Sequence, residues 1–233
     1  DRFNEFLERY VSEIKFRTFH YQKVEYTGDD ISAMFNGRFS RKPVYERFEN
    51  IAYFIVDRVE DNSPKEFPEE KKNNLARQIQ KQMVNLFAER NLVKLYVDFL
   101  AEMEPEYPGI SEYKNEYGKI CYEDILPILY LQVYFYGCNT YNNIKHLVID
   151  EMQDYTIFQY AILDRIFGCK KTILGDRYQV LFYNPEETVV DILTKIFAKR
   201  NGQGGYELME LSESYRSTAE ITEFCNNILG DEG

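Results

Sequence analysis

The sequence is poor in the residues and runs that mark membrane, disulfide-bonded and zinc-binding proteins. No apolar run approaches the ~18 residues that a membrane helix needs, because the longest candidate, 125–137, is interrupted by Pro127 and Gln132. The four cysteines lie far apart without a CxxC pair, and neither of the two histidines neighbours a cysteine. We therefore expect reduced, buried or half-buried thiols in a cytoplasmic protein, with no zinc site and no membrane partner.

Positive charge is in the minority, and the start of the chain carries neither an initiator methionine nor a signal-peptide pattern. The 28 Lys and Arg residues against 39 Asp and Glu residues give a net charge of −11. Because non-specific DNA affinity comes largely from neutralising phosphates, this chain alone should bind DNA weakly. The first residues, Asp1-Arg2-Phe3, already begin an amphipathic helical pattern, so we expect a chain cut from a longer protein.

The rest of the composition is that of an ordinary globular protein, with 44% apolar and 29% charged residues in 233. Helical spacing dominates the first ~110 residues. There we expect helices near 3–14, 30–37, 45–55, 68–89 and 91–100, and an extended segment at 19–26. Asp29 and Asp30 are candidate caps for the second helix, and Asn91 for the last. The segment Glu104–Gly109 breaks the pattern and marks a boundary.

The second part of the chain alternates strands and helices. We expect strands at 146–149, 172–174 and 206–211, and helices at 122–136, 155–167, 186–200 and 218–229. This alternation predicts a parallel sheet with crossover helices, and therefore an α/β fold.

The strongest chemical signal is the string Leu147-Val-Ile-Asp-Glu-Met-Gln-Asp154, in which an apolar strand ends in two carboxylates. Ligands bind at the carboxyl ends of strands in open α/β sheets. Asp150 offers oxygen atoms to a hard Mg²⁺ ion, and the adjacent Glu151 can orient or deprotonate a water molecule. An Asp-Glu pair alone is commonly a polar turn, but the full string is far more specific.

Two further strings follow strands. Thr172-Ile-Leu-Gly-Asp-Arg-Tyr-Gln179 ends a strand in a turn that Gly175 permits, and Gln179 can hydrogen-bond a phosphate or the attacking water. Leu211-Ser-Glu-Ser-Tyr-Arg-Ser-Thr218 places Arg216 where it suits bidentate phosphate binding and Tyr215 where it can stack on a base. The plain alternatives are an ordinary turn and an arginine in a surface ion pair.

In this order, the three strings resemble motifs II, III and IV of UvrD/Rep/PcrA-type superfamily 1 helicases, roughly DExxQD, GDxxQ and LxxNYRS. The resemblance covers about residues 120–229 and implies a DNA- or RNA-dependent ATPase. It implies that Asp150 holds Mg²⁺, largely through water, and that Glu151 is the catalytic base. It further implies that Gln179 senses the γ-phosphate and that Arg216 contacts it.

The same resemblance implies a set of nucleotide-binding and coupling residues. Tyr215 would stack on the adenine, and Gln153 and Asp154 would link the ATP site to motif III. Asp176, in the Gly-Asp turn of motif III, belongs to the same nucleotide-binding set.

The chain departs from the family pattern at two places. Ser214 stands where the family has Asn, and Val180-Leu-Phe-Tyr-Asn184 replaces the usual continuation of motif III with its DNA-stacking aromatic. Tyr178, Phe182 or Tyr183 are candidate substitutes, because stacking tolerates any exposed aromatic. In these departures the chain is more similar to the RNA-polymerase-associated HelD-type branch than to UvrD, Rep and PcrA.

No GxxxxGK[ST] phosphate-binding loop exists in the chain, and the glycine-rich stretch 202–205 does not open a helix. The resemblance therefore implies a partial RecA-like parallel sheet that lacks its P-loop strand. By position, 1–112 would be a helical accessory (1B-like) region, 113–211 the C-terminal part of the first motor domain, and 212–233 motif IV and the start of the second. We expect this chain alone to be inactive, and the edge of its first strand to be exposed or paired with another molecule.

Three functions follow as alternatives. The first is an ATP-dependent helicase or translocase that moves on single-stranded DNA or on RNA. The second is a helicase-like ATPase that remodels a protein partner such as RNA polymerase. The third is an unrelated Mg²⁺-dependent phosphohydrolase built on Asp150, Glu151, Asp154 and Asp176.

Overall fold

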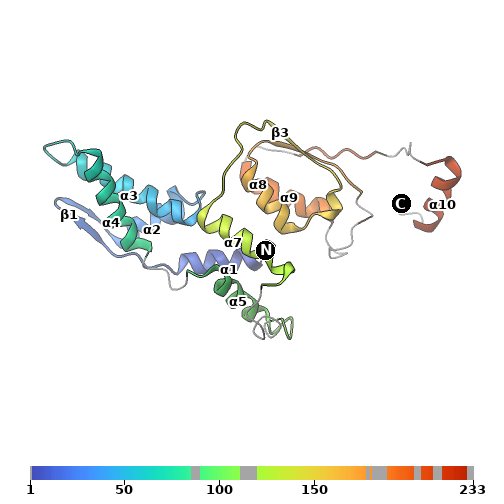
Figure 1. Cartoon of the computed structure of the whole chain (residues 1–233), viewed down its shortest axis with the longest axis horizontal. Helices are drawn as coiled ribbons and strands as arrows, with labels where there is room; N and C mark the ends of the chain where they lie inside the picture. The colour runs from blue at the N-terminus through green and yellow to red at the C-terminus, as the bar shows by residue number, and fades with distance from the viewer. Residues whose placement is uncertain are drawn as a thin grey trace. The chain divides into compact units, whose positions relative to one another are not determined.

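The computed structural model describes residues 2–84, 90–110, 120–176, 179, 188–201, 206–211 and 217–229. The chain forms two compact units, Asp1–Leu193 and Thr194–Gly233. Its described residues have a mixed α/β architecture that is mostly helical, with two small two-stranded sheets (Figure 1). The predicted α/β class is confirmed at this level.

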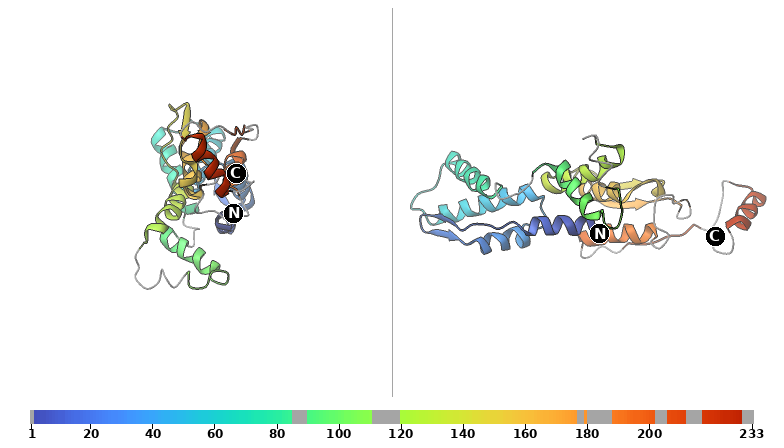
Figure 2. Two further views of the ribbon diagram at one scale, coloured as in Figure 1. Left: turned by 90° about the vertical axis from the view of Figure 1, so that its right-hand side faces the viewer. Right: turned by 90° about the horizontal axis from the view of Figure 1, so that it is seen from below.

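The N-terminal part of the first unit is built mainly from helices. They are α1 (Arg2–Ser12), α2 (Gly28–Ala33), the π-helical turn η1 (Met34–Arg38), α3 (Val44–Asp61), α4 (Glu69–Val84) and α5 (Leu92–Met103). The apolar residues of α1 recur every three or four positions, so Phe3, Phe6, Leu7 and Val11 all lie on its buried face. The helices α3 and α4 lie side by side, as Figure 2 also shows.

Capping side chains explain where two of these helices begin. The predicted cap at Asn91 is confirmed, because its Oδ1 accepts hydrogen bonds from the amides of Val93 at 3.0 Å and Lys94 at 3.3 Å. The predicted Asp cap of α2 is wrong. The cap is Thr27, whose hydroxyl accepts from the amide of Asp30 while the Asp30 carboxylate accepts from the Thr27 amide. Asp30 thus completes a capping box from inside the helix instead of starting it.

The helices of the second half continue the same hydrophobic core. After the 3₁₀ turn η2 (Tyr122–Asp124), α7 (Ile125–Tyr136) packs against α3, α5 and α8 (Ile157–Ile166). Leu131 and Phe135 of α7 and Ile162 of α8 are buried in the cluster that also contains residues of α1, α3, α4 and α5. Gly137 ends α7 with a φ of 80°, a conformation that glycine adopts without steric cost.

Two short sheets complete the first unit. The strands β1 (Phe19–Tyr21) and β2 (Val24–Tyr26) pair antiparallel, so the single extended segment predicted for 19–26 is a hairpin with a turn at 22–23. The strands β3 (His146–Ile149) and β4 (Lys170–Ile173) pair in parallel, with His146 opposite Lys170 and Ile149 opposite Ile173. The crossover between them contains α8, so this strand–helix–strand prediction is confirmed.

The third predicted strand is wrong. The helices α9 (Val189–Asn201) and α10 (Ala219–Leu229) form close to their predicted positions, but 206–211 contains no strand, and all six of its side chains are exposed. A strand is stabilised by a ladder partner and by packing of one face. Within the described residues this segment has no ladder partner, so its apolar alternation is not enough to form a strand.

Two expectations from composition can be compared with these elements. No helix in the described ranges combines the length and apolar character needed to cross a membrane. None of the four cysteines forms a disulfide. Cys225 is exposed on α10 and not buried or half-buried as expected, whereas the other three are half-buried.

Candidate functional site

The predicted acidic residues lie where β3 and β4 end at the same edge of the parallel pair. Beyond the strands, the Leu174 amide donates to the Ile149 carbonyl at 2.8 Å, and the Met152 amide donates to the Leu174 carbonyl at 2.9 Å. These two bonds continue the ladder past the last paired residues. The loop after β3, which carries Asp150 and Glu151, is therefore joined to the loop after β4.

Glu151 has an unusual backbone conformation. Its φ of 53° and ψ of 54° place it in the left-handed region, which costs a residue with a Cβ atom roughly 1–2 kcal/mol. The 3₁₀ turn η3 (Met152–Asp154) begins directly after it, and the Asp154 amide donates to the Glu151 carbonyl at 3.0 Å. The Asp150 Oδ1 atom accepts from the Glu151 amide at 2.9 Å. Contacts on both sides of the residue thus maintain the turn.

Gln153 bridges the two loops through its side-chain amide. Its Nε2 donates to the Glu151 Oε2 atom at 2.6 Å, and its Oε1 accepts from the Asp176 amide at 3.1 Å. Gln153 is a buried polar residue, with only 5% of its surface exposed. Because a buried amide needs partners for both of its ends, this pair of bonds fixes the position of the Glu151 carboxylate relative to the second loop.

Gln179 extends the same series of hydrogen bonds. Its Nε2 donates to the Asp176 Oδ2 atom at 2.9 Å, and its backbone amide donates to the Asp176 carbonyl at 3.4 Å. Glu151, Gln153, Asp176 and Gln179 are therefore linked one after another by hydrogen bonds. Asp154 joins the turn through its backbone, while its carboxylate is exposed to solvent.

The structure adds two residues that the sequence interpretation missed or explained differently. The predicted role of Gly175 was a tight turn, but its φ is not positive. A Cβ atom there would lie 2.5 Å from Met152 Cγ and 2.6 Å from Met152 N, so glycine is needed for close approach of the loops. Tyr160 of α8 is fully buried and donates to the Met152 carbonyl at 2.7 Å. Its signal in the sequence is a phenol in an apolar helix, since a buried hydroxyl needs a partner.

Other predicted site residues lie outside the described residues. These are Tyr215 and Arg216 of the third string, and the candidate stacking residues Tyr178, Phe182 and Tyr183. The glycine-rich stretch 202–205 also lies outside them.

The carboxylates suit a largely hydrated Mg²⁺ ion better than a dedicated metal cage. Asp150 and Glu151 are exposed at the strand end, and the second Asp150 oxygen stays available while Oδ1 accepts from the Glu151 amide. Mg²⁺ usually keeps several waters and binds one or two carboxylates, which this arrangement can supply. Within the described ranges no three His, Cys, Asp or Glu side chains come together as a metal-binding group.

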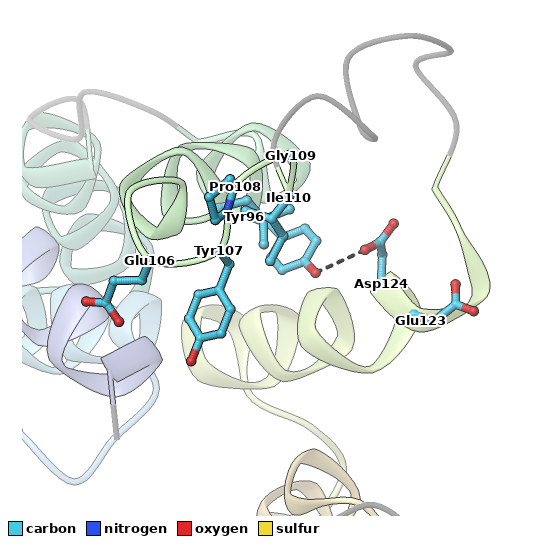
Figure 3. Close-up of a pocket in the computed structure, with 9 residues that line it drawn as sticks. Tyr96, Glu106, Tyr107, Pro108, Gly109, Ile110, Glu123 and Asp124 are labelled. Atoms are coloured by element: carbon cyan, nitrogen blue, oxygen red, sulfur yellow. Dashed lines mark hydrogen bonds between the residues drawn. The ribbon is translucent and has the colours of Figure 1, made fainter.

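A separate open pocket lies between the end of α5 and the start of α7 (Figure 3). Its volume is about 730 Å³. We call Asp150, Glu151, Gln153, Asp176 and Gln179 the strand-end site, and none of these residues lines the pocket. At its inner wall the Tyr96 hydroxyl donates to the Asp124 Oδ1 atom at 3.0 Å, and Asp124 is only 2% exposed. Burial, followed by this hydrogen bond, raises the pKa of Tyr96. The bond ties α5 to the segment before α7, which indicates a structural role for this wall.

Comparisons of the chain with protein-family models and with curated proteins gave no match.

Proposed function

We propose that this chain is part of the motor of a UvrD/Rep-like superfamily 1 helicase or translocase, in which hydrolysis of Mg-ATP drives movement on DNA or RNA. The observation that carries the proposal is the hydrogen-bonded series from Glu151 through Gln153 and Asp176 to Gln179. It connects two strings that resemble motifs II and III. A catalytic carboxylate and a second polar side chain are thereby coupled across a parallel strand pair, which is what a RecA-like motor core requires.

The residues of the strand-end site would divide the chemistry among them. Mg²⁺, when bound, would neutralise charge developing on the phosphates. Asp150 would hold it through water, and Glu151 would accept the proton of the attacking water. Gln179 would report the γ-phosphate to the Glu151 loop, because a shift of Gln179 changes its bond to Asp176 and hence the partner of Gln153.

Two predicted residues would complete the nucleotide site from beyond the described residues. In this proposal Arg216 contacts the γ-phosphate and Tyr215 stacks on the adenine. Asp154 would contribute through its position in the turn after Glu151. Since the sequence contains no P-loop, nothing here would supply the lysine and backbone amides that cradle the β- and γ-phosphates. We therefore propose that the full-length protein hydrolyses ATP and that this chain alone does not.

The test is ATP hydrolysis by the full-length protein, with and without single-stranded DNA, for the wild type and Glu151→Gln. Losing a general base costs about 100-fold or more in kcat. Glu66→Gln is the matched control, because it makes the same change at an exposed glutamate outside the site. DNA-stimulated hydrolysis that only Glu151→Gln abolishes would support the proposal. Hydrolysis that Glu151→Gln leaves intact would refute the catalytic assignment.

A second candidate is a helicase-like ATPase that remodels a protein partner such as RNA polymerase without unwinding DNA. The observation that favours it is the altered continuation of motif III at 180–184, where the family's DNA-stacking aromatic is replaced. The same assay separates the two, because hydrolysis indifferent to DNA but stimulated by polymerase would support this candidate. Both candidates place the protein in the cytoplasm, where cysteines that form no disulfide, such as these four, stay reduced.

A further inference from the structure

Tyr160 contacts the loop that carries Glu151, although it belongs to a different element. It lies in the middle of α8, its side chain is fully buried, and its ring lies 5.5 Å from that of Tyr155. Its hydroxyl donates to the Met152 carbonyl at 2.7 Å. A hydroxyl buried in this way is positioned by its acceptor, and the acceptor by the hydroxyl.

Met152, directly after Glu151, is held on both sides. Its amide donates to the Leu174 carbonyl beyond β4 at 2.9 Å, and its carbonyl accepts from Tyr160. Its amide also shares a peptide group with the Glu151 carbonyl. The left-handed conformation of Glu151, with φ at 53°, is therefore followed by two successive peptide groups that are both held, the first by Leu174 and the second by Tyr160 of α8.

The Glu151 side chain gives no reason for this conformation. Glycine, asparagine and aspartate are the residues that enter the left-handed region readily, and glutamate is not among them. Such a conformation persists only where the surroundings determine it. The surroundings here are the two bonds at Met152 and the Gln153 bridge.

We infer that Tyr160 is a positioning residue for the catalytic carboxylate of Glu151, acting through the Met152 carbonyl. This inference rests on the proposed function. Relaxation of Glu151 to an ordinary backbone conformation would redirect its side chain, and a general base works only within hydrogen-bond reach of the proton that it takes. Asp150 precedes the turn, so binding of Mg-ATP should depend much less on Tyr160.

The test compares Tyr160→Phe with wild type in the full-length protein. Phenylalanine keeps the ring that fills the core and removes only the hydroxyl. We expect kcat for ATP to fall about tenfold, since small misplacements of catalytic groups carry penalties of this size or larger, while KM for ATP stays within about twofold. In the nucleotide-free protein, amide hydrogen exchange in 150–155 should accelerate about tenfold, because the opening free energy of the turn falls by the net value of one hydrogen bond.

Tyr141→Phe is the control for both measurements. Tyr141 is 53% exposed and stacks on Phe167, and its hydroxyl has no hydrogen-bond partner within the described part of the chain. This variant should leave kcat and the exchange of 150–155 unchanged.

The outcomes separate this inference from the function on which it rests. Loss of hydrolysis in Glu151→Gln together with a kcat defect and faster exchange in Tyr160→Phe supports both. Loss in Glu151→Gln with an unchanged kcat in Tyr160→Phe overturns the positioning role alone, and so does unchanged exchange. Full activity of Glu151→Gln removes the proposed function and the inference with it.

Discussion

Replacing Gly175 by alanine should destabilise the site, because the added methyl group has no room. It would lie 2.6 Å from both the Gln153 Oε1 atom and the Met152 backbone nitrogen. A side-chain atom can move, but the Met152 nitrogen is held at 2.9 Å by the Leu174 carbonyl. Overpacking of this kind costs about 1–3 kcal/mol. Losing the bond between Gln153 and the Asp176 amide adds about 1 kcal/mol, so we expect a loss of about 2–4 kcal/mol.

Thermal and urea unfolding of this chain measure the effect, with Gly168→Ala as the control. No atom lies within 4 Å of a Cβ placed at Gly168, and its φ is not positive. The control should therefore be neutral or slightly stabilising, by up to about 1 kcal/mol. For a chain of this size, Gly175→Ala should lower Tm by roughly 4–16 °C. Equal stability of the two variants would show that the loops after β3 and β4 do not approach each other as described.

Three other substitutions or conditions test neighbouring parts of the argument. The Lys171 ammonium lies 3.0 Å from the Asp164 carboxylate, and the two side chains are only 12% and 13% exposed. Lys171→Met should therefore lower the free energy of unfolding, measured in urea, by about 2 kcal/mol. Lys170→Met, at the exposed neighbouring residue, should lower it by almost nothing, and equal losses would contradict the largely buried ion pair. Because Glu151 is left-handed, Glu151→Gly should be about 1 kcal/mol more stable than Glu151→Ala, although both lack the carboxylate; the reverse order would refute the backbone conformation. Burial raises the pKa of Tyr96 above the usual ~10. The folded state therefore keeps that proton longer, and stability should be full below pH ~10 and fall as pH rises further. Tyr96→Phe should weaken that fall in Tm measured between pH 8 and 12, and an unchanged profile would count against the burial.

Local patterns in the sequence were sufficient to predict most elements that are stabilised by their own residues or their own caps. The apolar spacing of α1 and α3 predicted their buried faces, and Asn91 predicted the start of α5. The segment 206–211 shows the limit of this reasoning. Alternating apolar residues are compatible with a strand, but the strand forms only if another chain segment pairs with it. The sequence of 206–211 alone does not specify such a partner.

The candidate site divides in the same way. The sequence by itself determined that Asp150, Glu151 and Asp176 follow strands, because strand ends and turns depend mainly on the residues of a short stretch of sequence. Only the tertiary structure decided that Gln153 bridges to the Asp176 amide, 23 residues away, and that Tyr160 holds the carbonyl of Met152, the residue after Glu151. It also showed that Gly175 is required for a close approach of two loops and not for a turn. The physical reason is that hydrogen bonds and steric contacts between distant segments depend on how those segments pack, which no short stretch of sequence specifies.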